Sequence, residues 1–419
     1  MYWQRKSYKE IKSIVFNALD ENNSFHNHNI MGLPATYLDP KNFPPDIGFL
    51  DEAPYVKSFI ENPNHIGLHT YHSSLPAFKG TQKIELDLLR ICAEEILKIE
   101  KDCYDGYIAP GGTECNIQAL WIYREYYKDI NGADDKEIFV LFSEDTHYSA
   151  HKACNLLQLN YKQLTVNFDN RNIKLDPLEK TLIEIQGKKI VKFIILIINL
   201  GTTMFGSVDN INKITKLLIK YNLKFKIHVD AAFGGFIYPF TNSKNKINFT
   251  DQNIDSISLD GHKMLKAPYG TGIFIIRKGL IDHVLTSQAN YIEGQDHTIC
   301  GSRSGANAIA TWMILNIYGS EKLKEHMLNL IKKTDYICNS LNELGISYFR
   351  NDNMNIITIR ANDISEKICK KFTLVPNTHT DKPNWWKIVV MDHVNWELIE
   401  KFINELVKSN NHNLIIEAS

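Results

Sequence analysis

The sequence predicts an α/β protein with a mostly parallel, doubly wound sheet, followed by a smaller α+β domain. From Gly80 onward, short β-type runs alternate with helical or loop segments, which is typical of parallel strands joined by crossover helices. The run Phe193–Ile198 is wholly apolar, as expected of a central strand that is buried on both faces. After Gly319 the alternation gives way to a long helical pattern and then to mixed strands and helices. This change predicts a second, smaller domain.

The elements of the first part of the chain follow from their apolar spacing. Residues 1–79 are rich in Asn, Pro and His, and we expect an N-terminal arm or dimerisation segment that needs a partner surface, with one amphipathic helix near residues 7–20. Ile84, Leu88 and Ile91 recur at the spacing of one helix face. Strands are expected at Glu137–Phe142, Lys162–Phe168, Ile190–Asn199, Lys224–Asp230, Ile254–Leu259 and Gly272–Arg277, with a helical segment at Asp209–Tyr221.

The boundary near residue 319 divides the rest into a large domain, residues 80–319, and a small domain, residues 320–419. The spacing by four of Leu398, Phe402 and Leu406 predicts a helix at the end of the small domain. Its other expected elements are a helix at about Ser320–Leu344, strands near Ile346–Arg350 and Asn355–Arg360, a helix near Ser365–Phe372 and a strand at Trp385–Met391.

Composition narrows the class of protein. A chain of 419 residues with 44% hydrophobic and 23% charged residues is ordinary for a soluble globular protein of two domains. Its net charge of −1 does not suggest nucleic acid or an anionic membrane as a partner. We expect no spanning helix and no signal peptide, because no apolar run is long enough. The seven cysteines are scattered without a Cys-x-x-Cys pair, so we expect neither a metal site nor disulfides, and a cytoplasmic location.

Lys263 and Asp230 each follow an expected strand at its carboxyl end, and such ends meet at one edge of a parallel sheet. A lysine that forms a Schiff base with an aldehyde, and a carboxylate that keeps a ring nitrogen protonated, are the two groups that pyridoxal phosphate needs. The alternative is a solvated loop lysine and a helix cap. Small Ala231 and Ala232 leave room for a flat ring, and His262 is placed to reach a phosphate or to orient the lysine.

A phosphate needs its own site, and the segment Pro110–Asn116 offers one. Glycines at the start of a helix let the backbone approach an anion closely, and the free N–H groups and helix dipole favour phosphate. Gly112 and Thr113 are the candidates, although a turn with a helix cap is the alternative. His147 and Thr203 also follow expected strands, where the imidazole is able to stack on a cofactor ring and the hydroxyl to bond it. Their alternatives are structural roles in turns and caps.

Six segments in order resemble the group II pyridoxal-phosphate-dependent amino-acid decarboxylases. They are Gly111-Gly-Thr-Glu-Cys-Asn, Asp145-Thr-His-Tyr-Ser, Gly201-Thr-Thr-Met-Phe-Gly, His228-Val-Asp-Ala-Ala-Phe-Gly-Gly, Ser256-Ile-Ser-Leu-Asp-Gly-His-Lys-Met and Gly301-Ser-Arg-Ser-Gly. The resemblance runs from about Phe78 to the C-terminus. It implies the aspartate-aminotransferase type of fold (fold type I), with 80–319 as the cofactor-binding domain, and a homodimer with active sites at the subunit interface.

The resemblance also implies roles for single residues. Lys263 becomes the Schiff-base lysine and Asp230 the partner of the ring nitrogen. The phosphate would be bound by Gly112, Thr113, His262 and, from the neighbouring subunit, Ser302. His147 stacks on one face of the ring and Ala232 packs on the other, with Thr203 beside it. Tyr291 corresponds to the family's mobile-loop tyrosine, which returns a proton to the substrate carbon after carbon dioxide leaves.

The implied reaction is α-decarboxylation of an L-amino acid to its amine, and the substrate stays open among histidine, an aromatic and an acidic amino acid. Some segments resemble the tyrosine/aspartate branch of the family and others the histidine and serine branch. The segment His69–Pro76 departs from the family pattern, and Lys387 stands where the tyrosine/aspartate branch usually carries arginine. Other functions remain: a carbon–carbon lyase of the sphingosine-phosphate lyase kind, transamination or desulfination, and a non-catalytic protein that binds pyridoxal phosphate.

Overall fold

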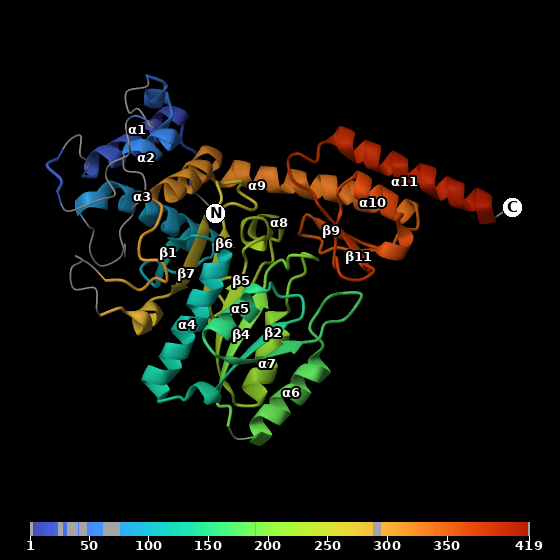
Figure 1. The fold of residues 1–419 in the computed structure, drawn as a ribbon, viewed down its shortest axis with the longest axis horizontal. Coiled ribbons are helices and arrows are strands. Elements are labelled where there is room, and N and C mark those ends of the chain that lie inside the picture. Colours follow the sequence, from blue (N-terminus) through green and yellow to red (C-terminus); the bar gives the residue numbers. More distant parts are fainter. Residues whose placement is uncertain are drawn as a thin grey trace.

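A seven-stranded sheet forms the centre of the molecule in the computed structural model (Figure 1). The structure describes residues 3–23, 28–31, 41, 48–61, 76–188, 190–287 and 295–417, without the side chains of 60, 61, 188 and 410–417. In spatial order the strands are β1 (Tyr104–Ala109), β7 (Gly272–Arg277), β6 (Ile254–Asp260), β5 (Lys224–Asp230), β4 (Phe193–Asn199), β2 (Ile138–Ser143) and β3 (Asn160–Leu164). Neighbouring strands from β6 to β3 are parallel, and β7 alone runs against both of its neighbours.

The sheet is covered on both faces, as its sequence requires. All seven residues of β4 are buried. Ile194 and Ile198 belong to the larger core cluster, whereas Phe193 and Ile197 belong to the cluster on the opposite face. Successive strand side chains point to opposite faces, so a strand without polar residues must have cover on each. The predicted α/β class with a mostly parallel, doubly wound sheet is confirmed.

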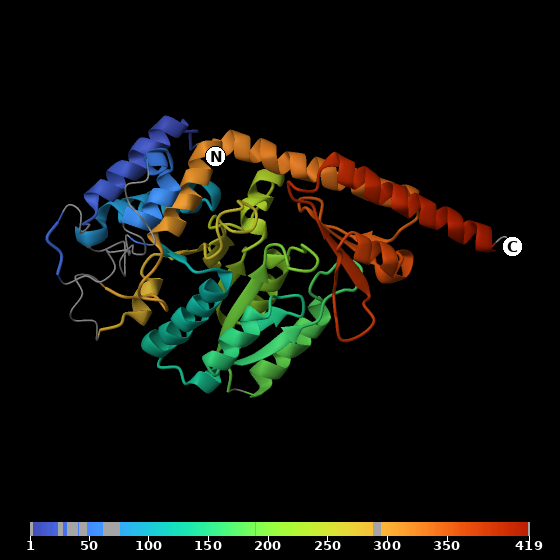
Figure 2. The same cartoon turned by 45° about the horizontal axis from the view of Figure 1, so that its top comes forward.

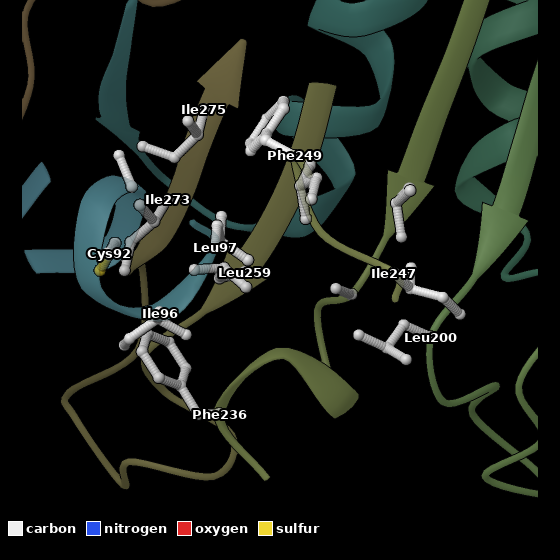
Figure 3. Close-up of a cluster of buried hydrophobic side chains, with 14 of the residues drawn as sticks. Cys92, Ile96, Leu97, Leu200, Phe236, Ile247, Phe249, Leu259, Ile273 and Ile275 are labelled. Atoms are coloured by element: carbon white, nitrogen blue, oxygen red, sulfur yellow. The ribbon is translucent and has the colours of Figure 1, made fainter. Parts of the chain in front are cut away.

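Helices from residues 79–241 supply this cover. On one face lie α4 (Gly112–Asn131) and α5 (Ser149–Leu156). On the other lie α3 (Lys79–Arg90) with its π-helical continuation (Ile91–Ile96), α6 (Leu175–Lys188), α7 (Ile211–Lys220) and α8 (Tyr238–Thr241). Figure 3 shows part of the larger core, where Cys92 and Ile96 of the π-helical segment meet Ile273 of β7. Short 3₁₀ turns occupy Gly48–Glu52, Pro76–Phe78, Asp135–Glu137, Gly234–Phe236, Leu280–Val284 and Ala361–Asp363.

The N-terminal segment contributes α1 (Tyr8–Glu21) and α2 (Pro54–Glu61). Ser7 caps α1 in a reciprocal capping box with Glu10, which satisfies free N–H groups of the first turn. The buried face of α1 packs against α3 and α9 of the same chain, and the Trp3 indole donates a hydrogen bond of 2.8 Å to the Leu315 carbonyl. The described part of this segment therefore adds to the core of its own chain.

Helix α9 (Gly305–Glu343) links the two parts of the molecule and runs along one side of it in both views (Figures 1 and 2). It begins fifteen residues before the expected helix because Ser304 caps it, accepting from the Asn307 N–H. Gly319 then kinks it, with φ 64° and ψ 172°. A Cβ on Gly319 would lie 2.7 Å from the backbone nitrogen of Arg5. Both the positive φ and this close contact with the N-terminal segment therefore require glycine.

The C-terminal part carries its own sheet and its own core. The antiparallel order is β10 (Val375–Pro376), β11 (Trp385–Val389), β9 (Ile356–Arg360) and β8 (Tyr348–Phe349), with α10 (Glu366–Lys371) and α11 (Trp396–Glu417). A third hydrophobic cluster is formed by residues from Ile337 onward. In Figure 2 the end of α11 projects away from this sheet. None of the described helices has both the length and the apolarity to cross a membrane.

Candidate active site

A pocket of about 520 Å³ lies at the carboxyl ends of the parallel strands, beside the start of α4. Eight predicted site residues from separate elements line it together: Gly112, Thr113, His147, Thr203, Asp230, Ala232, His262 and Lys263. They meet because parallel strands deliver the residues after their carboxyl ends to one edge. Ser302 is exposed and is not among the described residues that line this pocket. Tyr291 lies outside the described residues, as does most of His69–Pro76.

Asp230, the last residue of β5, turns its carboxylate into the pocket and is 9% exposed. Its Oδ2 accepts a hydrogen bond of 2.8 Å from Asn116 Nδ2, and its Oδ1 accepts one of 3.1 Å from the Ala232 N–H. Both donors are neutral, and no ion pair joins Asp230 to another described residue. Its negative charge is therefore available to a cation inside the pocket.

Asn116 on α4 determines which atoms carry the protons in the hydrogen-bond network around Asp230. Since it must present its amide N–H₂ to the carboxylate, its Oδ1 faces the other way, 2.8 Å from His228 Nε2 and 3.3 Å from Ser258 Oγ. An amide oxygen only accepts, so His228 carries its proton on Nε2. Its Nδ1 then accepts from Ser256 Oγ at 2.7 Å. His228 is thus a neutral histidine with both ring nitrogens satisfied.

The same amide sets the state of His147. Asn116 Nδ2 also donates to Ser149 Oγ at 2.8 Å, which leaves the Ser149 hydroxyl proton for His147 Nδ1 at 2.9 Å. His147 Nδ1 is therefore an acceptor, and the proton of the neutral ring sits on Nε2. Burial lowers the pKa of His147, partly opposed by the charge of Asp230. A neutral, flat ring at the pocket wall is suited to stacking on another ring.

The buried state of His228 predicts a pH dependence of stability. Burial lowers its pKa from 6.5 to about 4, so below pH 6.5 the unfolded chain binds a proton that the folded chain refuses. The free energy of unfolding should fall by up to about 3 kcal/mol as the pH drops from 7 to 4, since one pKa unit corresponds to about 1.4 kcal/mol. His228→Gln, which cannot titrate, should show a shallower fall in denaturant titrations at several pH values. Equal slopes for the two proteins would contradict this origin.

Lys263 pairs with a carboxylate other than Asp230. Its Nζ lies 3.0 Å from Asp260 Oδ2, and His262 Nε2 lies 3.5 Å from the same oxygen. Asp260 ends β6 and is 2% exposed, whereas the Lys263 side chain is about one-third exposed, at 34%. Burial raises the pKa of Asp260, an effect that the charges of Lys263 and His262 oppose.

The start of α4 has the features of an anion site. The N–H groups of its first residues have no acceptor within the helix and face the pocket. A Cβ on Gly112 would lie 3.1 Å from the Ala232 Cβ and from both Asp260 carboxylate oxygens, so a larger residue would have to displace these side chains. His262 Nδ1 is buried and has no hydrogen-bond partner among the described residues. This end of the pocket fits a phosphate, while Asp230 fits a protonated ring nitrogen and Lys263 a carbonyl carbon.

A second amine approaches the pocket from the four-stranded C-terminal sheet. Lys387 of β11 donates a hydrogen bond of 3.1 Å from Nζ to the Thr203 carbonyl. Burial, and after it the charge of Lys263, lower the pKa of Lys387. Two lysines that approach one region, one after β6 of the central sheet and one from β11 of the C-terminal sheet, favour an anion such as a carboxylate there.

Sequence reasoning missed Asn116, Ser149, His228 and Asp260 as parts of the site. One signal was available: His228 and Asp230 are two residues apart on one strand and therefore point to the same face. No comparable signal identified Asn116, whose contacts to β5 and β6 arise only when α4 packs across the sheet.

Comparisons with known proteins agree with this geometry. Residues 63–353 match a protein-family model described as the pyridoxal-dependent decarboxylase conserved domain. Tryptophan decarboxylase of Clostridium sporogenes is 44% identical over 416 residues, which are 99% of each chain. Serine decarboxylase 3 of Oryza sativa is 31% identical and covers 78% of this chain and 70% of its own. L-methionine decarboxylase from Streptomyces superposes with a TM-score of 0.70 at 20% identity, over 84% of this chain and 87% of that one.

Proposed function

The chain belongs to the pyridoxal-dependent decarboxylases and removes the α-carboxylate of an amino acid with pyridoxal phosphate as cofactor, and on this premise we propose that its substrate is L-tryptophan, released as tryptamine. The 44% identity to a tryptophan decarboxylase along nearly the whole of both chains carries this choice. Ile117, Phe233 and Ile299 give the pocket apolar walls that suit an indole ring. No arginine is among the described residues that line it, so an acidic side chain would lack a bidentate partner there.

Pyridoxal phosphate, when bound, supplies an aldehyde and an electron-accepting ring. We assign its phosphate to the start of α4, with Gly112, Thr113 and His262, and its ring nitrogen to Asp230, which holds a proton there. Because Asp230 is buried and receives only neutral hydrogen bonds, it gains a charge-assisted bond of about 1.5–3 kcal/mol from that N–H. Lys263 anchors the aldehyde carbon.

Other side chains orient the ring and the substrate. His147 packs on one face of the ring and Ala232 on the other, and Thr203 lies beside it. Lys387 receives the substrate α-carboxylate as a point charge, because an ammonium cannot make the bidentate contact of a guanidinium. Tyr291 delivers a proton to the carbon that has lost carbon dioxide.

A substrate survey tests the choice of tryptophan. Purified protein loaded with pyridoxal phosphate should release tryptamine and carbon dioxide in equal amounts. The kcat/KM for tryptophan should exceed that for histidine or aspartate by at least about 10²-fold, because a buried side chain without matched partners is costly to bind. Faster turnover of an acidic amino acid or of histidine would contradict the choice. Keto acid, sulfite or aldehyde as the main product would instead support one of the other reactions.

We also propose a homodimer with shared active sites. Tyr148 and Tyr269 line the pocket with 60% and 88% of their surface exposed, and Ile299 is 42% exposed beside them. Large apolar groups at the rim of a site are suited to burial against a second copy, and Ser302 of the partner subunit would then complete the phosphate site. Light scattering of the loaded protein should give twice the chain mass. A fully active monomer would refute the shared site.

The division into a cofactor-binding domain (80–319), a small domain (320–419) and an N-terminal segment (1–79) is proposed as well. The separate core from Ile337 onward supports it. Hydrogen exchange should find the C-terminal core opening as a unit of its own, and a single cooperative opening of the whole chain would contradict it. The unpaired state of all seven cysteines supports a cytoplasmic location, which cell fractionation would test.

A further inference from the structure

Asp260 is a buried carboxylate to which none of the roles proposed above has been assigned. Its Oδ2 lies 3.0 Å from Lys263 Nζ, and its Oδ1 has no hydrogen-bond partner within the described part of the chain. The turn that ends β6 brings the two residues together, since they are three positions apart. Asp260, and not Asp230, is thus the carboxylate in contact with the Lys263 amine.

The surroundings of Asp260 make it responsive to the charge on that amine. Its charged or titratable neighbours are Lys263 and His262 on the same turn, Asp230 on β5, Cys115 on α4 and His147 after β2. Burial and the charge of Asp230 raise the pKa of Asp260, whereas the ammonium of Lys263 and, after it, the charge of His262 lower it. When the ammonium loses its charge, the largest of the effects that lower the pKa of Asp260 is removed, so protonation of Asp260 becomes more favourable.

We propose that Asp260 is the proton acceptor and donor for Lys263 when this lysine bonds to the cofactor, a role that rests on the proposed attachment of pyridoxal phosphate to Lys263. Asp260 takes one proton from the ammonium, and the freed amine forms a carbon–nitrogen bond to the aldehyde carbon. A second nitrogen proton moves to the aldehyde oxygen. Asp260 returns its proton to that oxygen, the carbon–oxygen bond breaks and water leaves. The carboxylate is then ionised again beside a protonated nitrogen.

Asp260→Asn tests this role because it keeps the shape of the side chain and removes its basicity. Full-length chain stripped of cofactor is mixed with pyridoxal phosphate, and attachment is followed by absorbance and by timed borohydride trapping with mass analysis of the Lys263 peptide. At pH 7 the variant should attach cofactor about 10²-fold more slowly. Its rate should rise steeply as the pH increases, since only solvent base can then take the proton from the ammonium. The unaltered protein should show a much flatter profile.

Asp255→Asn is the matched control, because Asp255 lies on the same strand, is 7% exposed and pairs with Lys226 at 2.7 Å. It should attach cofactor at the unaltered rate. A normal rate for Asp260→Asn, or a slow rate without the steeper pH profile, would overturn the role of Asp260. If Asp260→Asn fails to fold by circular dichroism, Asp260→Ser is measured in its place against the same criteria. Absence of label on Lys263 in the unaltered protein would instead refute the proposed function of Lys263.

Discussion

Lys263→Ala is expected to abolish covalent attachment of the cofactor and to reduce amine release by about 10⁴-fold. That loss is near the upper limit of what one positioned side chain contributes to a covalent or proton-transfer step. Lys263 is the one lysine among the described residues that line the pocket, and the amine of Lys387, which approaches the same region, is bonded to the Thr203 carbonyl, so we expect no other amine to form this link. The measurements are the absorbance of the linked cofactor, borohydride trapping followed by peptide mapping, and tryptamine release.

Lys266→Ala serves as the control for this variant. Lys266 lies on the same loop, but its amine pairs with Asp392 outside the pocket. It should retain both the attached cofactor and the activity. Trapping of label on a peptide without Lys263 in the unaltered protein, or an unchanged absorbance in Lys263→Ala, would show that another amine holds the cofactor.

Asp230→Asn is expected to lower kcat by about 10²–10³-fold while the cofactor remains attached to Lys263. An amide at this position cannot stabilise a positive charge on the ring nitrogen, and the loss of one such preorganised electrostatic contact has this magnitude. Asn116 Nδ2 and the Ala232 N–H donate to different oxygens of Asp230, so the single amide oxygen of the variant keeps only one of these two hydrogen bonds. Tryptamine release and trapping on the Lys263 peptide, measured side by side, separate the two effects.

Asp209→Asn is a suitable comparison, because Asp209 is also buried but bonds to Asn199 and does not line the pocket. It should leave kcat within a few-fold of the unaltered protein. If Asp230→Asn keeps full kcat, Asp230 is not the partner of the ring nitrogen. If it loses the attached cofactor instead, its main contribution is to cofactor binding.

The sequence predicted most of the sheet, because a strand that is buried on both faces is a continuous apolar run. It also predicted the residues at the carboxyl edge, because the carboxyl ends of parallel strands lie at one edge of the sheet. It did not predict β1 (Tyr104–Ala109), whose Asp105, Gly106 and tyrosines break that signal. The expected strand at Lys162–Phe168 ends at Leu164, since Val166 pairs with Ile173 in a turn. These differences come from tertiary contacts that a local pattern does not contain.

The candidate site was predictable in its residue types but not in its pairings. The sequence indicated that Lys263 and Asp230 meet at one edge of the sheet, but it did not indicate their partners within the chain, which are Asp260 for Lys263 and Asn116 for Asp230. Both contacts depend on the turn geometry after β6 and on how α4 crosses the sheet. The Lys263–Asp260 pair is local, three residues apart, but the spacing alone does not show the turn that joins them; the Asp230–Asn116 contact crosses elements, and such contacts have no fixed separation in sequence.

The charged form of Lys387 is destabilised in the protein without substrate, because burial and the charge of Lys263 lower its pKa. Its ammonium is partly buried, which lowers its pKa, and it donates a hydrogen bond to the Thr203 carbonyl. An anion that enters beside it does not have to strip hydration from this cation, and it raises the lysine's depressed pKa back toward its ordinary range. We therefore expect a substrate carboxylate to bind more firmly at Lys387 than at a surface lysine, and to lose this charge interaction when it leaves as neutral carbon dioxide.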